Sequence, residues 1–156
     1  MNIKTKLATA ILLAVGYVST ATAHDIQFQA LSAASGPSAT DIWESSCNNA
    51  TGPESFRMAA RIQDHIPGRS DKISLVIYKD GIAATTTDLV GGGSQKSPYV
   101  YVNGGNGTYS FIVHHVTSTG TTLADDVYYS VEFHCEASDL TTHTGTTIPS
   151  VALQDQ

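Results

Sequence analysis

Apolar and polar residues alternate along most of the chain with a period of two. The clearest case is the run over residues 127–137, where one face is apolar and contains a cysteine. That face holds Val127, Tyr129, Val131, Phe133, Cys135 and Ala137, and the opposite face holds Tyr128, Ser130, Glu132, His134 and Glu136. This period is typical of a β-strand with one buried face in an antiparallel sheet.

Shorter runs with the same period predict the other strands, and no window predicts an amphipathic helix. The expected strands cover residues 26–30, 42–47, 56–63, 73–78, 82–89, 99–102, 109–116 and 127–137. In the first of them, Ile26, Phe28 and Ala30 alternate with two glutamines. We therefore expect Phe28 on the buried, apolar face of that strand.

Turn signals separate these runs at short intervals. The strongest is the Asp80-Gly81 pair, because glycine tolerates the positive φ of a tight hairpin turn. Roughly seven to nine short strands spaced in this way predict an all-β fold, namely an antiparallel β-sandwich. We expect the sandwich domain to span residues 24–149 and residues 150–156 to form a flexible C-terminal tail.

The composition fits one globular domain. The chain has 156 residues, of which 41% are hydrophobic and 14% are charged, which excludes a disordered polar chain and a coiled coil. The 8 basic and 14 acidic residues give a formal net charge of -6. A nucleic-acid partner is not expected, because phosphate binding requires a basic surface.

The first 23 residues have the pattern of a bacterial secretory signal peptide. Lys4 and Lys6 precede an apolar stretch over residues 7–18, and Ala21-Thr22-Ala23 is a small-x-small cleavage signal. The apolar stretch is shorter than the roughly 20 residues that a membrane span needs. We expect cleavage after Ala23 and an exported protein, periplasmic or extracellular, without a membrane span after processing.

Two cysteines, Cys47 and Cys135, remain in the expected mature chain. An even number of cysteines in an exported protein predicts a disulfide, which we expect to join the two sheets of the sandwich. The chain-entropy model assigns a loop of this length about 4–5 kcal/mol of stabilisation. Trp43 close to Cys47, together with a tyrosine-rich strand that ends in Cys135, resembles the immunoglobulin-like arrangement. This resemblance implies architecture and no particular activity.

Motifs for catalysis are absent from the sequence. It contains no G-x-S-x-G, no phosphate-binding glycine loop followed by lysine, no H-E-x-x-H and no EF-hand spacing. Because no nucleophile–base set is present, a non-catalytic protein is expected. The chemistry that remains lies in six histidines, all of them after residue 23.

His24 would be the first residue of the processed chain. A free α-amine and the Nδ1 atom of the same residue can chelate one ion, and a second histidine can complete a site suited to copper. In this one feature the chain resembles exported copper-binding proteins and oxidative polysaccharide enzymes that use an N-terminal histidine brace. The resemblance implies copper or zinc binding at His24.

A second candidate site combines two histidines near the end of the chain. If Ser138-Asp139 is a two-residue turn, His134 lies directly opposite His143 on neighbouring strands. Opposed residues have Cβ atoms about 5 Å apart, which would allow both imidazoles to bind one metal ion. Glu132 and Glu136 would flank them on the same polar face.

Three classes of function follow from these features. The first is an exported, non-catalytic binding protein for copper or zinc, with His24 as the central ligand. The second is a surface-structural protein, or a module that binds an extracytoplasmic protein or glycan without metal. This class is suggested by tyrosines in the C-terminal half of the chain, namely Tyr99, Tyr101, Tyr109, Tyr128 and Tyr129. The third is a copper-dependent oxidative enzyme, which would also need an open metal position.

Overall fold

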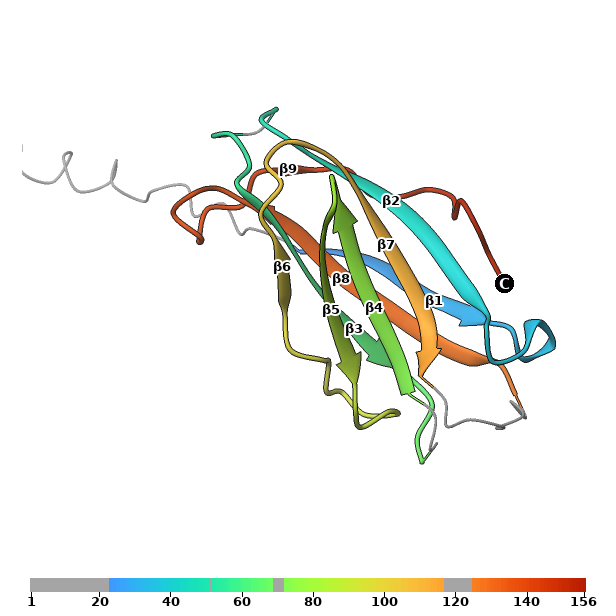
Figure 1. Cartoon of the computed structure of the whole chain (residues 1–156). Coiled ribbons are helices and arrows are strands. Elements are labelled where there is room, and N and C mark those ends of the chain that lie inside the picture. The colour runs from blue at the N-terminus through green and yellow to red at the C-terminus, as the bar shows by residue number, and fades with distance from the viewer. Residues whose placement is uncertain (1–22, 51, 69–71, 117–124) are drawn as a thin grey trace, which may run out of the picture.

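The computed structural model describes residues 23–50, 52–68, 72–116 and 125–156. All but the last residue of the predicted signal peptide lie outside these ranges. The described residues form nine strands and one short 3-10 turn, η2 (Ala33–Ser35) (Figure 1). The strands are β1 (His24–Leu31), β2 (Thr40–Asn48), β3 (Arg57–Asp64), β4 (Lys72–Lys79), β5 (Ile82–Asp88), β6 (Val100–Val102), β7 (Gly107–Val116), β8 (Val127–Glu136) and β9 (Gly145–Thr146).

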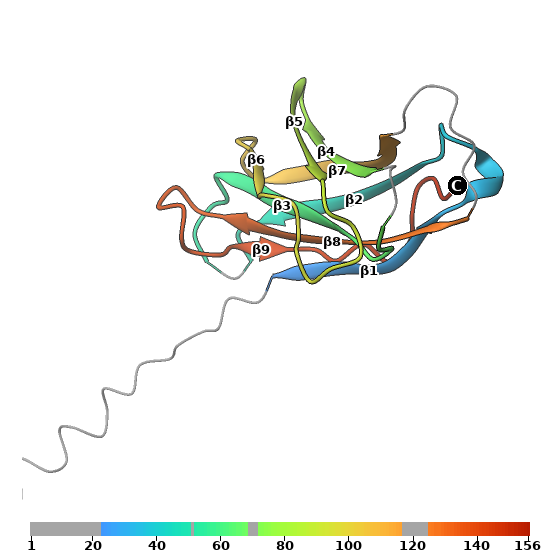
Figure 2. The same cartoon turned by 90° about the horizontal axis from the view of Figure 1, so that it is seen from below.

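The strands form two antiparallel sheets. Sheet A has the order β1-β8-β3-β6, and sheet B has the order β5-β4-β7-β2-β9. Figure 2 shows the sheets as two layers that face each other. The predicted antiparallel β-sandwich is confirmed. Among the described residues, no helix is long and apolar enough to cross a membrane.

The alternation in the sequence decides which side chains fill the space between the sheets. On β8 the apolar face turns inward beside those of β1 and β3 in sheet A, and the inward faces of β2, β4 and β7 in sheet B meet them. The largest of these fully buried side chains are Tyr109, Tyr129, Phe111, Phe133, Leu31 and Met58. Cys47 of β2 and Cys135 of β8 form a disulfide with a Cα–Cα distance of 5.7 Å. The predicted bond is therefore confirmed, and it links the two sheets.

The core also contains a polar chain that runs from one sheet to the other. The indole Nε1 of Trp43 donates to the hydroxyl of Tyr129 at 2.9 Å, and that hydroxyl donates to Asp41 Oδ2 at 2.6 Å. Asp41 Oδ1 accepts a hydrogen bond from the backbone N–H of Gln156 at 2.8 Å. Burial raises the pKa of Asp41, although the hydrogen bonds from Tyr129 and Gln156 oppose that increase. Each polar atom in this chain therefore has a partner, as buried polar groups require.

The C-terminal residues lie along β2. The backbone N–H of Ile42 donates to the carbonyl of Gln154 at 2.9 Å, and the N–H of Leu153 donates to the carbonyl of Ile42 at 2.7 Å. The N–H of Ser32 donates to the carbonyl of Gln156. The expectation of a flexible tail did not anticipate these bonds, because the segment has no strand pattern of its own and its partners are distant in sequence.

Two local predictions have opposite outcomes. The Asp80-Gly81 hairpin is confirmed, since both residues have positive φ (49° and 83°) between β4 and β5. The inward orientation expected for Phe28 is wrong, because its side chain is 69% exposed. A β-bulge between Ile26 and Gln29 places two residues of β1 opposite one residue of β8. The extra residue changes the face on which Phe28 lies.

Candidate metal centre

The site begins with the polar face of β8, which points away from the core. Glu132, His134 and Glu136 lie on this face, yet each is less than a tenth exposed. Long side chains from elsewhere in sheet A cover them, among them Arg57 and Arg61 of β3. Carboxylates and imidazoles are thus removed from water on a face that simple alternation would leave solvated.

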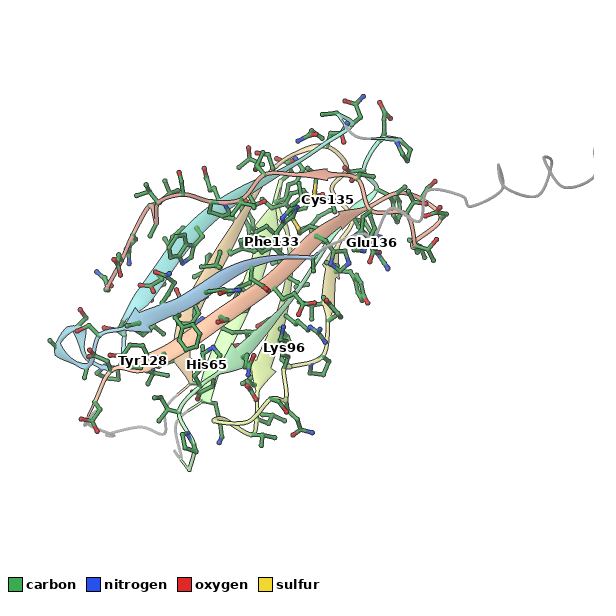
Figure 3. The ribbon with its side chains drawn as sticks, turned by 180° about the vertical axis from the view of Figure 1, so that it is seen from behind. His65, Lys96, Tyr128, Phe133, Cys135 and Glu136 are labelled. Atoms are coloured by element: carbon green, nitrogen blue, oxygen red, sulfur yellow. A yellow bond between two sulfur atoms is a disulfide. The ribbon has the colours of Figure 1, made fainter. Side chains whose placement is uncertain are left out.

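A second segment completes the site where β1 ends. β1 begins with His24 opposite Phe133, so the last residues of β8 lack a β1 neighbour. Residues 142–144 take that place: the N–H of Ala137 donates to the carbonyl of Thr142 at 2.8 Å. In this register His143 lies opposite Glu136. Figure 3 shows Glu136 at this end of β8.

The predicted two-residue turn at Ser138-Asp139 is wrong. The connection contains four residues, 138–141, and Leu140 adopts a left-handed conformation with φ 62°. The Asp139 carboxylate accepts hydrogen bonds from the backbone N–H groups of Thr141 and Thr142 and from the Thr142 hydroxyl. These bonds, led by the Thr142 hydroxyl, lower the pKa of Asp139 to about 2. An aspartate that bonds the backbone after it favours the wider turn.

The wider turn shifts the register by two residues without separating the histidines. His134 becomes the diagonal neighbour of His143, and their rings stack with centroids 4.1 Å apart and an interplanar angle of 11°. His134 Nε2 lies 2.8 Å from Glu136 Oε1. One ligand atom from each of His134, Glu136 and His143 lies within 4.8 Å of the others. We call these three residues the His–Glu–His cluster.

Two nitrogen atoms of the cluster are buried without a partner. The Nδ1 atoms of His134 and His143 make no hydrogen bond to any described residue. A buried polar atom without a partner costs free energy, so such an atom calls for an explanation. A bound cation would supply the missing partner.

The groups around the cluster favour the neutral form of His143 and fix the orientation of Glu136. Burial lowers the pKa of His143, and the positive potential of His134 and His24 lowers it further, while Glu136 acts in the opposite direction. A lowered pKa favours the neutral imidazole, which is the form that binds a metal ion. The other oxygen of Glu136, Oε2, accepts from Arg57 Nε at 2.6 Å, which fixes the carboxylate with Oε1 toward His134.

Two imidazoles and one carboxylate form a donor set that suits zinc or copper(II). An imidazole nitrogen binds a metal ion in the plane of its ring. Because the two stacked rings are nearly parallel, a single ion cannot lie in both planes, and one ring must turn when the ion binds. His143 is the less buried of the pair and is the ring with more freedom to turn.

Glu132 lies outside this cluster. Its carboxylate accepts two hydrogen bonds from Arg61 Nη2, at 2.8 and 2.9 Å, and further bonds from Lys96 and the hydroxyl of Tyr99. Burial alone would raise the pKa of Glu132, but these hydrogen bonds outweigh it and lower the pKa to about 2. A carboxylate with three partners has little capacity left for a metal ion.

His24 is near the cluster but does not belong to it. In the antiparallel pairing it shares the inward face with Phe133, and the two ring centroids are 6.1 Å apart. The side chain of His134 points to the opposite face of the sheet. The charge of His24 also lowers the pKa of His143.

Sequence reasoning missed the residues that enclose the cluster. Tyr99 presents its ring to His134 edge-on, with centroids 5.4 Å apart, and Arg57 lies 3.8 Å above the centroid of Tyr101. Arg57 alternates with Phe56 and Met58 in the sequence, which places it on the polar face of its strand and was a usable signal. Nothing in the sequence indicated that the side chains of Lys96 and Tyr99 reach Glu132 and His134 of β8, because that contact depends on the path of a loop.

Comparisons of the chain with protein-family models, with curated proteins and with solved structures find no match. The class of this protein is therefore described by its fold and its candidate site alone. The protein is an antiparallel β-sandwich with a disulfide between its sheets and a His–Glu–His cluster on the outer face of one sheet.

Proposed function

We propose that this protein is an exported, non-catalytic β-sandwich that binds zinc or copper(II) through His134, Glu136 and His143. The observation that carries the proposal is the pair of buried, unpartnered Nδ1 atoms beside a carboxylate that Arg57 holds in place. Zinc and copper sites in proteins use these ligand types.

Export is the second part of the proposal. Disulfides persist in oxidising compartments, and the Cys47–Cys135 bond closes the end of β8 that carries the cluster. Cleavage after Ala23 would place a free α-amine on His24, at the start of β1. We propose His24 as an additional ligand that becomes available only in the processed protein.

Calorimetric titration of the disulfide-bonded protein that starts at His24, with Zn²⁺ and Cu²⁺ in turn, tests the site. We expect one ion per chain and an affinity at least tenfold weaker in the His143→Ala variant, on the scale of losing one ligand. His114→Ala is the matched control, because His114 is a half-buried histidine on the outer face of sheet B. An equal affinity in both variants would contradict the proposal.

Two further experiments test the His24 ligand and the cleavage site separately. A protein that retains one extra residue before His24 has no free amine on His24, and we expect it to lose affinity for Cu²⁺ more than for Zn²⁺. N-terminal sequencing of the protein recovered from its native compartment tests the cleavage site itself. A different first residue would remove the His24 contribution and leave the His–Glu–His cluster untouched.

A further inference from the structure

A second site lies at the other end of the outer face of sheet A. Figure 3 shows His65 and Lys96 on this face, away from Glu136. A shallow hollow of about 180 Å³ is lined by Asp25, Gln27, Phe28, Gln63, His65 and Lys96. It shares no side chain with the His–Glu–His cluster.

The bulge in β1 builds this hollow. Gln27 and Phe28 both lie opposite Ser130 of β8, and both side chains are exposed. The N–H of Phe28 donates to Ser130 Oγ at 3.3 Å, and the same hydroxyl lies 2.8 Å from His65 Nε2. Bulges re-aim side chains at sites of function. Here the bulge moves an aromatic ring from the core face to the surface.

The surface position of Phe28 is energetically unfavourable for its backbone and for its side chain. Its φ of 50° is a conformation that bulky residues rarely adopt. Its side chain is 69% exposed, although burial of a phenylalanine would stabilise the fold. One ring face stacks on His65, with centroids 4.6 Å apart and an interplanar angle of 13°, so the ring has a fixed orientation. An exposed, oriented ring on a strained backbone is a feature of a recognition surface.

The polar groups around the ring can form more hydrogen bonds than they do. Asp25 Oδ1 is buried and has no hydrogen-bond partner within the described part of the chain. The amide of Gln63 uses its nitrogen on the carbonyl of Gly93, at 2.7 Å, and its oxygen is an available acceptor. The hollow therefore offers acceptors for hydroxyl groups beside an apolar surface.

The charge and size of the hollow limit the ligand. Its lining has one carboxylate, Asp25, and one ammonium group, Lys96. Lys96 shares the Glu132 carboxylate with Arg61, so two positive and two negative groups lie in and beside the hollow. This balance favours a neutral ligand over an anion or a cation. The volume is below the roughly 300–1,000 Å³ of pockets that enclose drug-sized molecules, so one small ring is the largest unit that it can hold.

We propose that this hollow binds one sugar residue of a neutral glycan. The C–H face of the sugar ring stacks on the open face of Phe28. The sugar hydroxyls donate to the amide oxygen of Gln63 and, once the carboxylate turns its buried Oδ1 toward the hollow, to Asp25. Gln27 lies at the rim. This inference concerns a different site and does not depend on metal binding.

The test is a glycan array that displays neutral oligosaccharides built from glucose, mannose, galactose or N-acetylhexosamine, with sulfated and sialylated glycans as separate arms. All steps contain EDTA, so that the result is independent of the proposed metal site. The oligosaccharide with the strongest signal is then titrated by calorimetry. We expect a neutral glycan to bind, and Phe28→Asn to weaken its binding at least tenfold.

The choice of variants keeps the test decisive. Asparagine tolerates positive φ, so Phe28→Asn removes the ring without imposing new backbone strain, and its circular dichroism spectrum should match that of the parent. Gln63→Ala should also weaken binding. Tyr78→Ala, which removes a 45% exposed ring from sheet B, should leave it unchanged. The proposal is overturned if no neutral glycan binds, if only anionic glycans bind, or if folded Phe28→Asn binds like the parent.

Discussion

The outer faces of the two sheets follow the same alternation but carry different chemistry. The outer face of sheet B carries mainly short hydroxyl and aliphatic side chains, together with Tyr78 and His114. Ser74 Oγ bonds the hydroxyls of Thr85 and Thr87, and Ser46 bonds Thr108. The outer face of sheet A instead carries charges beneath aromatic rings, with Arg61 lying 4.4 Å from the centroid of Tyr99.

This difference shows what a covering layer does to a polar face. Short hydroxyl side chains satisfy one another and create no deep burial of charge. The long arginine and tyrosine side chains of sheet A exclude water from Glu132 and His134, which strengthens electrostatic interactions on that face. The groups with useful ligand chemistry are therefore concentrated on sheet A, although histidine also occurs on sheet B.

The largest expected effect concerns the bond that joins the two sheets. Replacing Cys47 and Cys135 together by alanine should lower the free energy of unfolding by about 2–5 kcal/mol, the usual cost of losing a native disulfide in a small exported domain. Metal affinity should fall as well, because Cys135 is next to Glu136 and its N–H donates to Thr146 Oγ1. Urea unfolding and calorimetry measure the two effects. A stability loss below about 1 kcal/mol would show that packing alone joins the sheets.

A matched pair of truncations compares the outer faces directly. Glu132→Ala on sheet A should lower the free energy of unfolding by about 1.5–3 kcal/mol, because it removes charge-assisted bonds from Arg61 and Lys96. Ser74→Ala on sheet B should lower it by about 0.5–1.5 kcal/mol, the usual value for neutral hydrogen bonds. Urea unfolding of both variants provides the comparison. Equal losses of unfolding free energy would mean that the arginine and tyrosine side chains over sheet A do not strengthen the interactions beneath them.

The smallest effect concerns Asp41, which lies in the core between the two sheets. Through this residue the free energy of unfolding should depend on pH. The pKa of Asp41 is raised, mainly by burial, so the folded protein keeps that proton to a higher pH than the unfolded chain does. The stability contributed by protonated Asp41 is present at low pH and is lost as pH rises through the raised pKa. The free energy of unfolding of the parent should therefore fall relative to that of Asp41→Asn, which cannot ionise, as the pH rises from about 3 to about 7. A parent that gains stability relative to the variant over this range would contradict this assignment.

Much of the architecture followed from the sequence alone. Alternation on β8 identified the inward face with Cys135 and the outward face with His134. The Asp-Gly pair identified the β4–β5 hairpin, and two cysteines together with a predicted signal peptide predicted the disulfide. These inferences succeed because strand parity and turn chemistry are local: they depend on a residue and on neighbours a few positions away.

Only the tertiary structure decided the rest. The bulge that turns Phe28 outward adds one residue opposite Ser130, and a parity argument cannot detect such an insertion. The four-residue turn placed His143 opposite Glu136 rather than His134, since Asp139 forms side-chain bonds that compete with the tighter turn. The cover over β8 and the position of the C-terminal residues on β2 depend on contacts between segments distant in sequence. Such contacts are decided by packing of the whole chain, and no local pattern encodes them.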